Sequence, residues 1–419
     1  MRRLLYILLL LPLHLMAQIT PEEYRAEVVE YSLALKIKNN NVTGAVEAVK
    51  LAKTGLLPSL SAEGNINYLL REISGQHRWA WGVQPAIYQT IYAGGGLRAA
   101  YNKARLETEI ALCDAEFTML EVCYAADYAY WNLLAMEKYL SATKEYVAII
   151  SSLKEAIEWR FSEGYVAKGD LLMILSRLSE AEYLLVSAEQ SHETALHNFN
   201  SLRGHQSGAN SSLSPPVLTN TDPPARVSTD ELTGRRPDYI SADLYHDVTE
   251  VNIKSVRSQY NPQLDAAILG GWSRESPMIG GGGRVDGAVG LTLSLPIFQF
   301  GARSKAVAIA RISEQNAELA VAQLRDAILL EESNGWTNIT RSEAQLHSAR
   351  RSLEIAGENL EISTFSYREG LTTIVDVMQA QLSWMQIYTN SIESEFNFLV
   401  AISAYDKIVA KEPRISDGN

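Results

Sequence analysis

YREGLTTIVDVMQAQ (residues 367–381) interrupts a stretch without proline that runs from Ile297 to Glu412. Much earlier the chain reads FSEGYVAKGDLLMIL (residues 161–175), inside a second proline-free stretch from Ala86 to Ser214. At one constant offset the two motifs share an aromatic residue, a glycine and an aspartate. Both stretches are rich in Ala, Leu, Glu and Gln, which favour helices, whereas glycine permits a turn. The sequence therefore predicts two long helical hairpins, each turning at its motif.

Apolar residues recur every seven positions in the helical stretches, as at Leu346, Leu353 and Leu360. This period is typical of a coiled-coil seam. At 1.5 Å per residue, each long helix would measure about 100 Å, more than a compact core needs. Thr20, Pro21 and Glu23 have the residue types of a helix N-terminal cap. The helices are expected over residues 21–54, 97–161, 170–202, 302–367 and 376–410.

Four segments alternate between apolar and small or polar residues with the period of a β-strand. The clearest is RVDGAVGLTLSL, residues 284–295, and the others lie at residues 60–68, 79–87 and 264–272. Aromatic residues lie near the strand ends, at Trp79, Trp81, Tyr92, Trp272 and Phe298. This pattern fits strands with lipid on one side and water on the other, although a soluble sandwich gives the same alternation. Four strands cannot close a barrel, so the membrane interpretation requires an oligomer.

Residues 1–17 read as a cleaved secretory signal, because Arg2 and Arg3 precede an apolar run that is too short to span a bilayer. Cys113 and Cys123 are too far apart along one helix to form a disulfide within the chain. The formal net charge of −12 makes nucleic acid an unsuitable partner. An acidic chain of this kind is either simply soluble or lines a path for cations.

These features together resemble the outer-membrane factors of TolC type. The residues that carry the resemblance are GRRPDYISADLYHDV (234–248), LPIFQFGARSKA (295–306) and the duplicated hairpin motif. The resemblance implies a mostly α protein with a transmembrane β-barrel part, built from two structural repeats. Each subunit of a homotrimer would give four strands to a twelve-stranded barrel, continued by a periplasmic α-barrel of long coiled-coil hairpins.

The function implied is that of an outer-membrane channel of a tripartite efflux or type I secretion system. Such a passive exit duct docks to a periplasmic adaptor (membrane fusion protein) and an inner-membrane pump, contacts outer-membrane lipid, and uses no cofactor. A periplasmic coiled-coil adaptor without a barrel is the alternative, but an adaptor has a single hairpin and needs no amphipathic strands.

The resemblance also implies roles for residues at the hairpin turns. Asp376 would face the pore, and three copies would favour cations on the axis. Asp170 has the same position in the first hairpin, where an ordinary helix cap is an equally good explanation. Tyr367 is expected either to donate a hydrogen bond to Asp170 of a neighbouring subunit in a closed state or to pack as an ordinary aromatic. The adaptor-binding tips would be formed by Glu163, Gly164, Glu369, Gly370 and Leu371.

Two departures from the family pattern concern these turns. Gln379 stands where a second acidic residue is common, which puts a double acidic ring in doubt. Glu163 and Glu369 replace the usual valine before each turn glycine, which would alter adaptor preference.

The predicted organisation has five parts. They are a signal peptide (1–17), a first repeat of helix, two strands and hairpin (18–210), a linker (211–236), a second such repeat (237–411) and a tail (412–419).

No motif in the sequence predicts an enzyme. His192 and His197 are five positions apart and so do not share the helix face that a zinc-protease motif requires. The glycine runs lack the lysine and hydroxyl residue of a phosphate-binding loop. We expect no catalytic or metal site.

Overall fold

The computed structural model describes residues 18–68, 70, 78–209, 213–214, 224–274 and 284–411. The predicted signal peptide and tail lie outside these residues, as does most of the linker before residue 224. The chain divides into two compact units. We call them the helical unit (Met1–Leu35, Thr118–Leu232 and Ile328–Asn419) and the sheet unit (Lys36–Phe117 and Thr233–Ala327).

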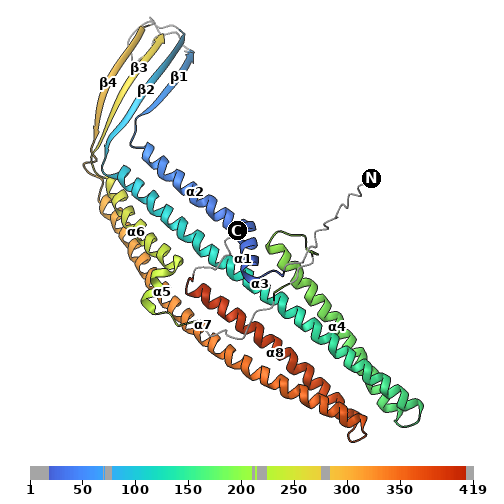
Figure 1. Ribbon diagram of the computed structural model, residues 1–419. Helices are drawn as coiled ribbons and strands as arrows, with labels where there is room; N and C mark the ends of the chain where they lie inside the picture. The colour runs from blue at the N-terminus through green and yellow to red at the C-terminus, as the bar shows by residue number, and fades with distance from the viewer. Residues whose placement is uncertain are drawn as a thin grey trace, which may run out of the picture. The chain divides into compact units, whose positions relative to one another are not determined.

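The order helix, two strands, long helix and returning helix occurs twice along the chain (Figure 1). The first succession is α1 (Pro21–Tyr31), α2 (Leu33–Thr54), β1 (Ser59–Tyr68), β2 (Trp79–Ala93), α3 (Gly96–Ser162) and α4 (Lys168–Leu202). The second is α5 (Thr229–Arg235), α6 (Pro237–Ser258), β3 (Gln263–Arg274), β4 (Arg284–Ser294), α7 (Ala302–Arg368) and α8 (Ile374–Ile408). The fold is thus mostly helical with four strands, as expected, and the boundaries of the two repeats stay a prediction.

The predicted single helix over residues 21–54 is wrong in one respect, because it is broken at Ser32. The amide of Ser32 donates to the carbonyl of Val28 at 2.8 Å and ends α1, while its hydroxyl accepts from the amide of Leu35 at 3.3 Å and starts α2. At the other end of α1 the expected capping box is present, with Thr20 and Glu23 bonded to each other's backbone amides. Serine can cap either side of a break because its hydroxyl competes with the helix backbone for hydrogen bonds.

The four strands of the sheet unit form one antiparallel sheet in the order β1-β2-β3-β4 (Figure 1). The register brings the predicted apolar alternations onto one face. One row crosses all four strands: Leu60 pairs with Ile87, Ile87 with Ile268, and Ile268 with Val289. These side chains are 76%, 38%, 51% and 81% exposed, respectively. The face is therefore apolar and uncovered in the single chain.

Pro85 lies inside β2, although proline cannot donate to a sheet ladder. Gly270 of β3 makes room for it, because a Cβ added at Gly270 would come within 3.2 Å of the Pro85 ring. The close approach explains why a glycine stands in the middle of β3.

In the helical unit, α4 lies along the second half of α3, and α8 lies along the second half of α7 (Figure 1). One cluster of buried apolar side chains joins all four helices. It includes Ile150 and Ile157 of α3, Ile174 of α4, Leu360 of α7 and Val377 of α8. The two hairpins thus share a core and do not merely lie next to each other.

Helix α1 is held in a second core of the same unit. The ring of Tyr24 stacks on Phe199 with centroids 3.9 Å apart, and its hydroxyl donates to the Phe199 carbonyl at 2.9 Å. Arg25 donates to the carboxylate of Asp127, which is 7% exposed. A buried carboxylate that keeps its charge needs such a partner.

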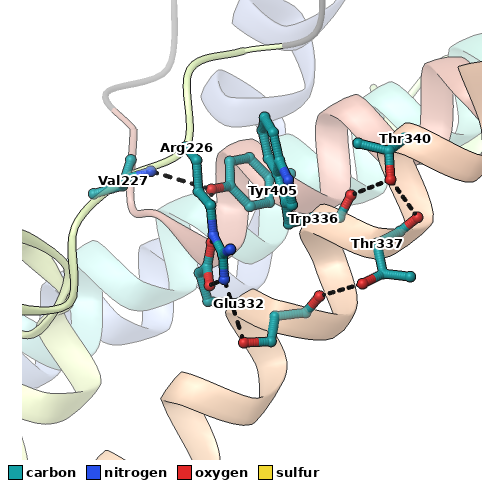
Figure 2. Close-up of polar contacts among 8 residues, drawn as sticks. Arg226, Val227, Glu332, Trp336, Thr337, Thr340 and Tyr405 are labelled. Atoms are coloured by element: carbon teal, nitrogen blue, oxygen red, sulfur yellow. Dashed lines mark hydrogen bonds and ion pairs between the residues drawn. The ribbon is translucent and has the colours of Figure 1, made fainter.

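The described end of the predicted linker is pinned to α7 and α8 by a polar cluster (Figure 2). Arg226 donates two hydrogen bonds to the carboxylate of Glu332, both at 2.9 Å. The hydroxyl of Tyr405 donates to Glu332 at 3.1 Å and accepts from the amide of Val227 at 3.3 Å. Glu332 is only 6% exposed, and the hydrogen bonds from Arg226 lower the pKa of its carboxyl.

No helix among the described residues is both long enough and apolar enough to cross a membrane. Cys113 and Cys123 are both free and buried. Burial raises the pKa of the Cys123 thiol to about 11, so this thiol is protonated and unreactive at neutral pH.

Candidate functional site: the hairpin turns

The two predicted turns have the same backbone structure. Gly164 has φ +79° and Gly370 has φ +75°, values that favour glycine over any residue with a Cβ. In both turns the residue after the glycine donates its amide to a carbonyl of the ending helix at 2.8 Å: Tyr165 to Arg160, and Leu371 to Ser366. This is the Schellman arrangement that ends many helices. The repeated motif therefore encodes a repeated helix end.

The start of α8 is capped by side chains. The carboxylate of Asp376 accepts from the amide of Thr373 at 3.0 Å, from its hydroxyl at 2.6 Å, and from the hydroxyl of Thr372 at 2.7 Å. The Thr373 hydroxyl accepts in return from the amide of Asp376 at 3.3 Å. Bonds to Thr373 and Thr372 favour the charged carboxylate and lower the pKa of Asp376. Asp376 is thus an exposed, charged and fixed carboxylate.

Asp170 occupies the same position in α4 but is not fixed in this way. The N-cap residue of α4 is Ala167, which has no side chain that could bond the helix amides. Among the described residues, nothing forms a hydrogen bond with the Asp170 carboxylate. The capping explanation that the sequence offered for Asp170 therefore applies to Asp376 instead. Whether either carboxylate faces a pore stays a prediction.

The predicted adaptor-binding tips are exposed. Glu163, Gly164, Glu369 and Gly370 are open to solvent, and Leu371 is 77% exposed. Sequence reasoning missed two exposed aromatic residues at the first turn: Tyr165 is 74% exposed and Trp159 is 62% exposed, with ring centres 6.4 Å apart. Exposed apolar groups gathered at one place mark interaction surfaces, so the tips have the chemistry that a protein partner requires.

Tyr367 is the buried member of the predicted site, with 6% of its surface exposed. It belongs to the core that joins the two hairpins, so in the single chain it packs as an ordinary aromatic. The hydrogen bond to Asp170 of a neighbouring subunit stays a prediction.

Arg160, at the end of α3, contacts Tyr367 and was missed by sequence reasoning. Its guanidinium lies 4.9 Å from the centre of the Tyr367 ring. It also donates to the carbonyl of Tyr367 at 3.3 Å and to that of Arg368 at 2.8 Å. Carbonyls at a helix C-terminus attract cations, so Arg160 holds the end of α7 beside α3.

Within the described residues, no group of three or more His, Cys, Asp or Glu side chains is placed to hold a metal ion. His197 lies 3.8 Å from Glu193 on the same helix face, and both side chains are largely exposed. This pair is a surface contact.

Known proteins are similar to this chain along most of its length. The model of the family described as "Outer membrane efflux protein" matches residues 27–205 and 229–394. Outer membrane protein TolC of Escherichia coli (strain K12) is 22% identical over 375 residues, which cover 85% of this chain and 75% of TolC.

Several solved structures have the same fold as this chain. A structure of CusC superposes with a TM-score of 0.83 at 14% identity and covers 94% of this chain and 92% of CusC. The CmeC outer membrane channel of Campylobacter jejuni also has a TM-score of 0.83, at 18% identity, covering 95% of this chain and 87% of CmeC. The family match spans more than half of the chain and includes both hairpin turns. The chain therefore belongs to the outer membrane efflux protein family and, like its relatives, lies in the bacterial outer membrane and extends into the periplasm.

Proposed function

We propose that three copies of this chain form a passive exit duct, the outer-membrane channel of a tripartite efflux or type I secretion system. The observation that carries the proposal is the uncovered apolar face of the four-stranded sheet. Its large side chains, such as Leu60, Val289 and Leu291, are 70% to 81% exposed. Lipid is the surrounding that such a face requires.

The edges of the sheet support a trimer. Among the strands that the structure describes, β1 and β4 each have a neighbour on one side only. Unpaired strand edges are not tolerated in lipid, and four strands are too few to close a barrel. Three copies, with β1 of one subunit paired to β4 of the next, would give a closed barrel of twelve strands.

The hairpin turns would form the periplasmic mouth of this duct. Two turns per chain give six in a trimer, which suits a ring of adaptor molecules leading to an inner-membrane pump. In this arrangement Asp376, Asp170 and Tyr367 belong to the pore and gate. The adaptor would contact the exposed tips at Glu163, Gly164, Glu369, Gly370 and Leu371. The proposed role is passive transport and involves no catalysis.

The alternative of a periplasmic adaptor without a barrel does not fit the family. The outer membrane efflux protein model matches residues 27–205 and 229–394, which include all four strands and both hairpin turns. We therefore propose the exit duct and not the adaptor.

The trimer and its lipid face can be tested together by gel electrophoresis of outer-membrane fractions. We expect an unheated sample to migrate as a trimer, and a boiled sample to migrate as the single chain. Leu291→Arg should remove most of the trimer, because a charge on the lipid side of a barrel strand costs about 2–4 kcal/mol near the membrane centre. Thr292→Arg is the matched control, since the next residue of β4 points to the other face. A wild-type chain that stays monomeric and soluble without detergent would refute the proposal.

A further inference from the structure

A groove of about 790 Å³ lies in the helical unit where α3, α7 and α8 meet. Small residues line two of its walls. Ala148, Ser152 and Ala156 follow one face of α3, and Gly357 and Thr364 lie on α7. Because these side chains are short, the helices leave space between them. The volume falls in the range of small-molecule sites, about 300–1,000 Å³.

Two residues that line this groove each carry a buried polar atom without a partner. Gln381 is 1% exposed and Tyr367 is 6% exposed. Within the part of the chain that the structure describes, neither Oε1 of Gln381 nor the hydroxyl of Tyr367 has a hydrogen-bond partner. Buried polar groups are nearly always satisfied in native proteins, so two unsatisfied ones on residues that line the same groove indicate a molecule that comes from outside the fold.

The lining restricts the chemistry of this molecule. An amide oxygen only accepts hydrogen bonds, so a partner for Gln381 must bring an N–H or O–H donor. Trp384 and Phe365 provide aromatic walls, and Leu153 and Leu360 add apolar surface. Aromatic walls favour a flat aromatic guest.

The charges of the lining cancel. Glu145 and Glu361 contribute two carboxylates, and Arg160 and Arg368 contribute two guanidinium groups. A groove without net charge gives no preference to a cation or an anion. The guest that the groove fits best is therefore neutral.

We propose that the groove binds a neutral polycyclic aromatic compound whose ring N–H donates to Oε1 of Gln381. The rings pack between α3 and α7 against Trp384 and Phe365. The guest lies within one subunit and bridges the two hairpins, so the site does not depend on the trimeric duct. Ordered water is the competing occupant.

Carbazole and dibenzofuran form a matched pair of probes. Both are flat, neutral tricyclic molecules, but carbazole has an N–H where dibenzofuran has an oxygen atom. Binding of each to the full-length protein in an amphipathic polymer can be measured by equilibrium dialysis. We expect saturable binding of carbazole, about tenfold tighter than that of dibenzofuran, because a buried acceptor favours the guest that satisfies it.

Gln381→Leu tests the residue directly, since leucine keeps most of the volume and removes the acceptor. This variant should bind the two probes equally. Its melting temperature should not fall, because the change also removes an unsatisfied buried oxygen. Gln379→Leu, at an exposed position of the same helix, is the control and should behave as wild type.

Three results would overturn the proposal. The first is equal binding of the two probes to the wild-type protein, and the second is tighter carbazole binding that persists in Gln381→Leu. The third is no saturable binding of either probe, which would mean that the groove holds water only.

Discussion

The guanidinium of Arg160 lies over the ring of Tyr367, 4.9 Å from its centre, and joins the end of α3 to the end of α7. The two residues belong to different hairpins, so this contact couples the two turns of one chain. Any movement that separates the turns has to break it.

Arg160→Ala should therefore loosen the turn between α7 and α8. It removes the contact with the Tyr367 ring and the hydrogen bonds to two helix-end carbonyls, which together stabilise by about 2 kcal/mol. Hydrogen exchange of the amides from Ser366 to Thr372 should accelerate more than tenfold. Arg351→Ala, at an exposed position of α7, is the control and should leave these rates unchanged. Equal exchange in both variants would show that Arg160 does not hold the turn.

The two returning helices should respond in opposite directions to changes at their N-caps. Thr373→Ala removes the cap of α8 and should destabilise its first turn by about 1 kcal/mol. Ala167→Ser supplies a cap that α4 lacks and should stabilise the start of that helix by a similar amount. Asp170 already has the position that completes a capping box with such a serine. Exchange rates of the first-turn amides of each helix measure both effects. If Ala167→Ser gives no added protection, Asp170 does not complete a capping box at this position.

Replacing Gly357 of α7 and Gly370 of the following turn by alanine should change the stability of the protein in opposite directions. An added Cβ meets no atom within 4 Å at either Gly370 or Gly357. Gly370 has φ +75°, so Gly370→Ala should cost about 1–2 kcal/mol by backbone strain alone. Gly357 lies inside the helix, so Gly357→Ala should stabilise by about 0.5–1 kcal/mol. Thermal unfolding of the two variants makes the comparison, and a loss of stability in both would mean that space, not backbone conformation, decides.

The cluster around Glu332 predicts a pH dependence. Arg226 lowers the folded-state pKa of this carboxyl below its ordinary value of 4.5. A depressed pKa stabilises the fold above pH 4.5, and this stabilisation is lost as the pH falls through the folded-state value. Arg226→Ala should therefore lower the melting temperature at pH 7, and the difference from wild type should shrink below pH 4.5. Arg351→Ala should show no such trend, and a difference that stays constant with pH would exclude Glu332 as its source.

The sequence was most informative where local chemistry decides the structure. The ends of α3, α7, α4 and α8 lie within two residues of the predicted positions, because glycine turns and caps act over a single helical turn. The strands were found because alternation reports directly on which face is apolar. The difference in helix capping between Asp170 and Asp376 could also be predicted from the sequence. It depends on the residue three positions earlier, which is Ala167 in one helix and Thr373 in the other.

Other features could not be read because they depend on residues distant in the chain. The space that Gly270 leaves for Pro85 depends on strand register. The contact of Arg160 with Tyr367 depends on how two hairpins pack. The break at Ser32 is local, but the sequence does not predict it, because serine also occurs within helices.

In the proposed duct, Asp376 lines the mouth. Single-channel conductance of the full-length protein in a planar bilayer examines this arrangement, with ion selectivity read from the reversal potential in a salt gradient. We expect small cation-selective openings in the wild type, more frequent openings in Arg160→Ala, and loss of selectivity in Asp376→Asn. Because its hydrogen bonds lower the pKa of Asp376, the selectivity should persist until the pH falls below the ordinary value of 3.8. If neither the folded wild type nor Arg160→Ala conducts ions, the duct is contradicted; if both conduct and Asp376→Asn keeps full selectivity, the mouth is not where we place it.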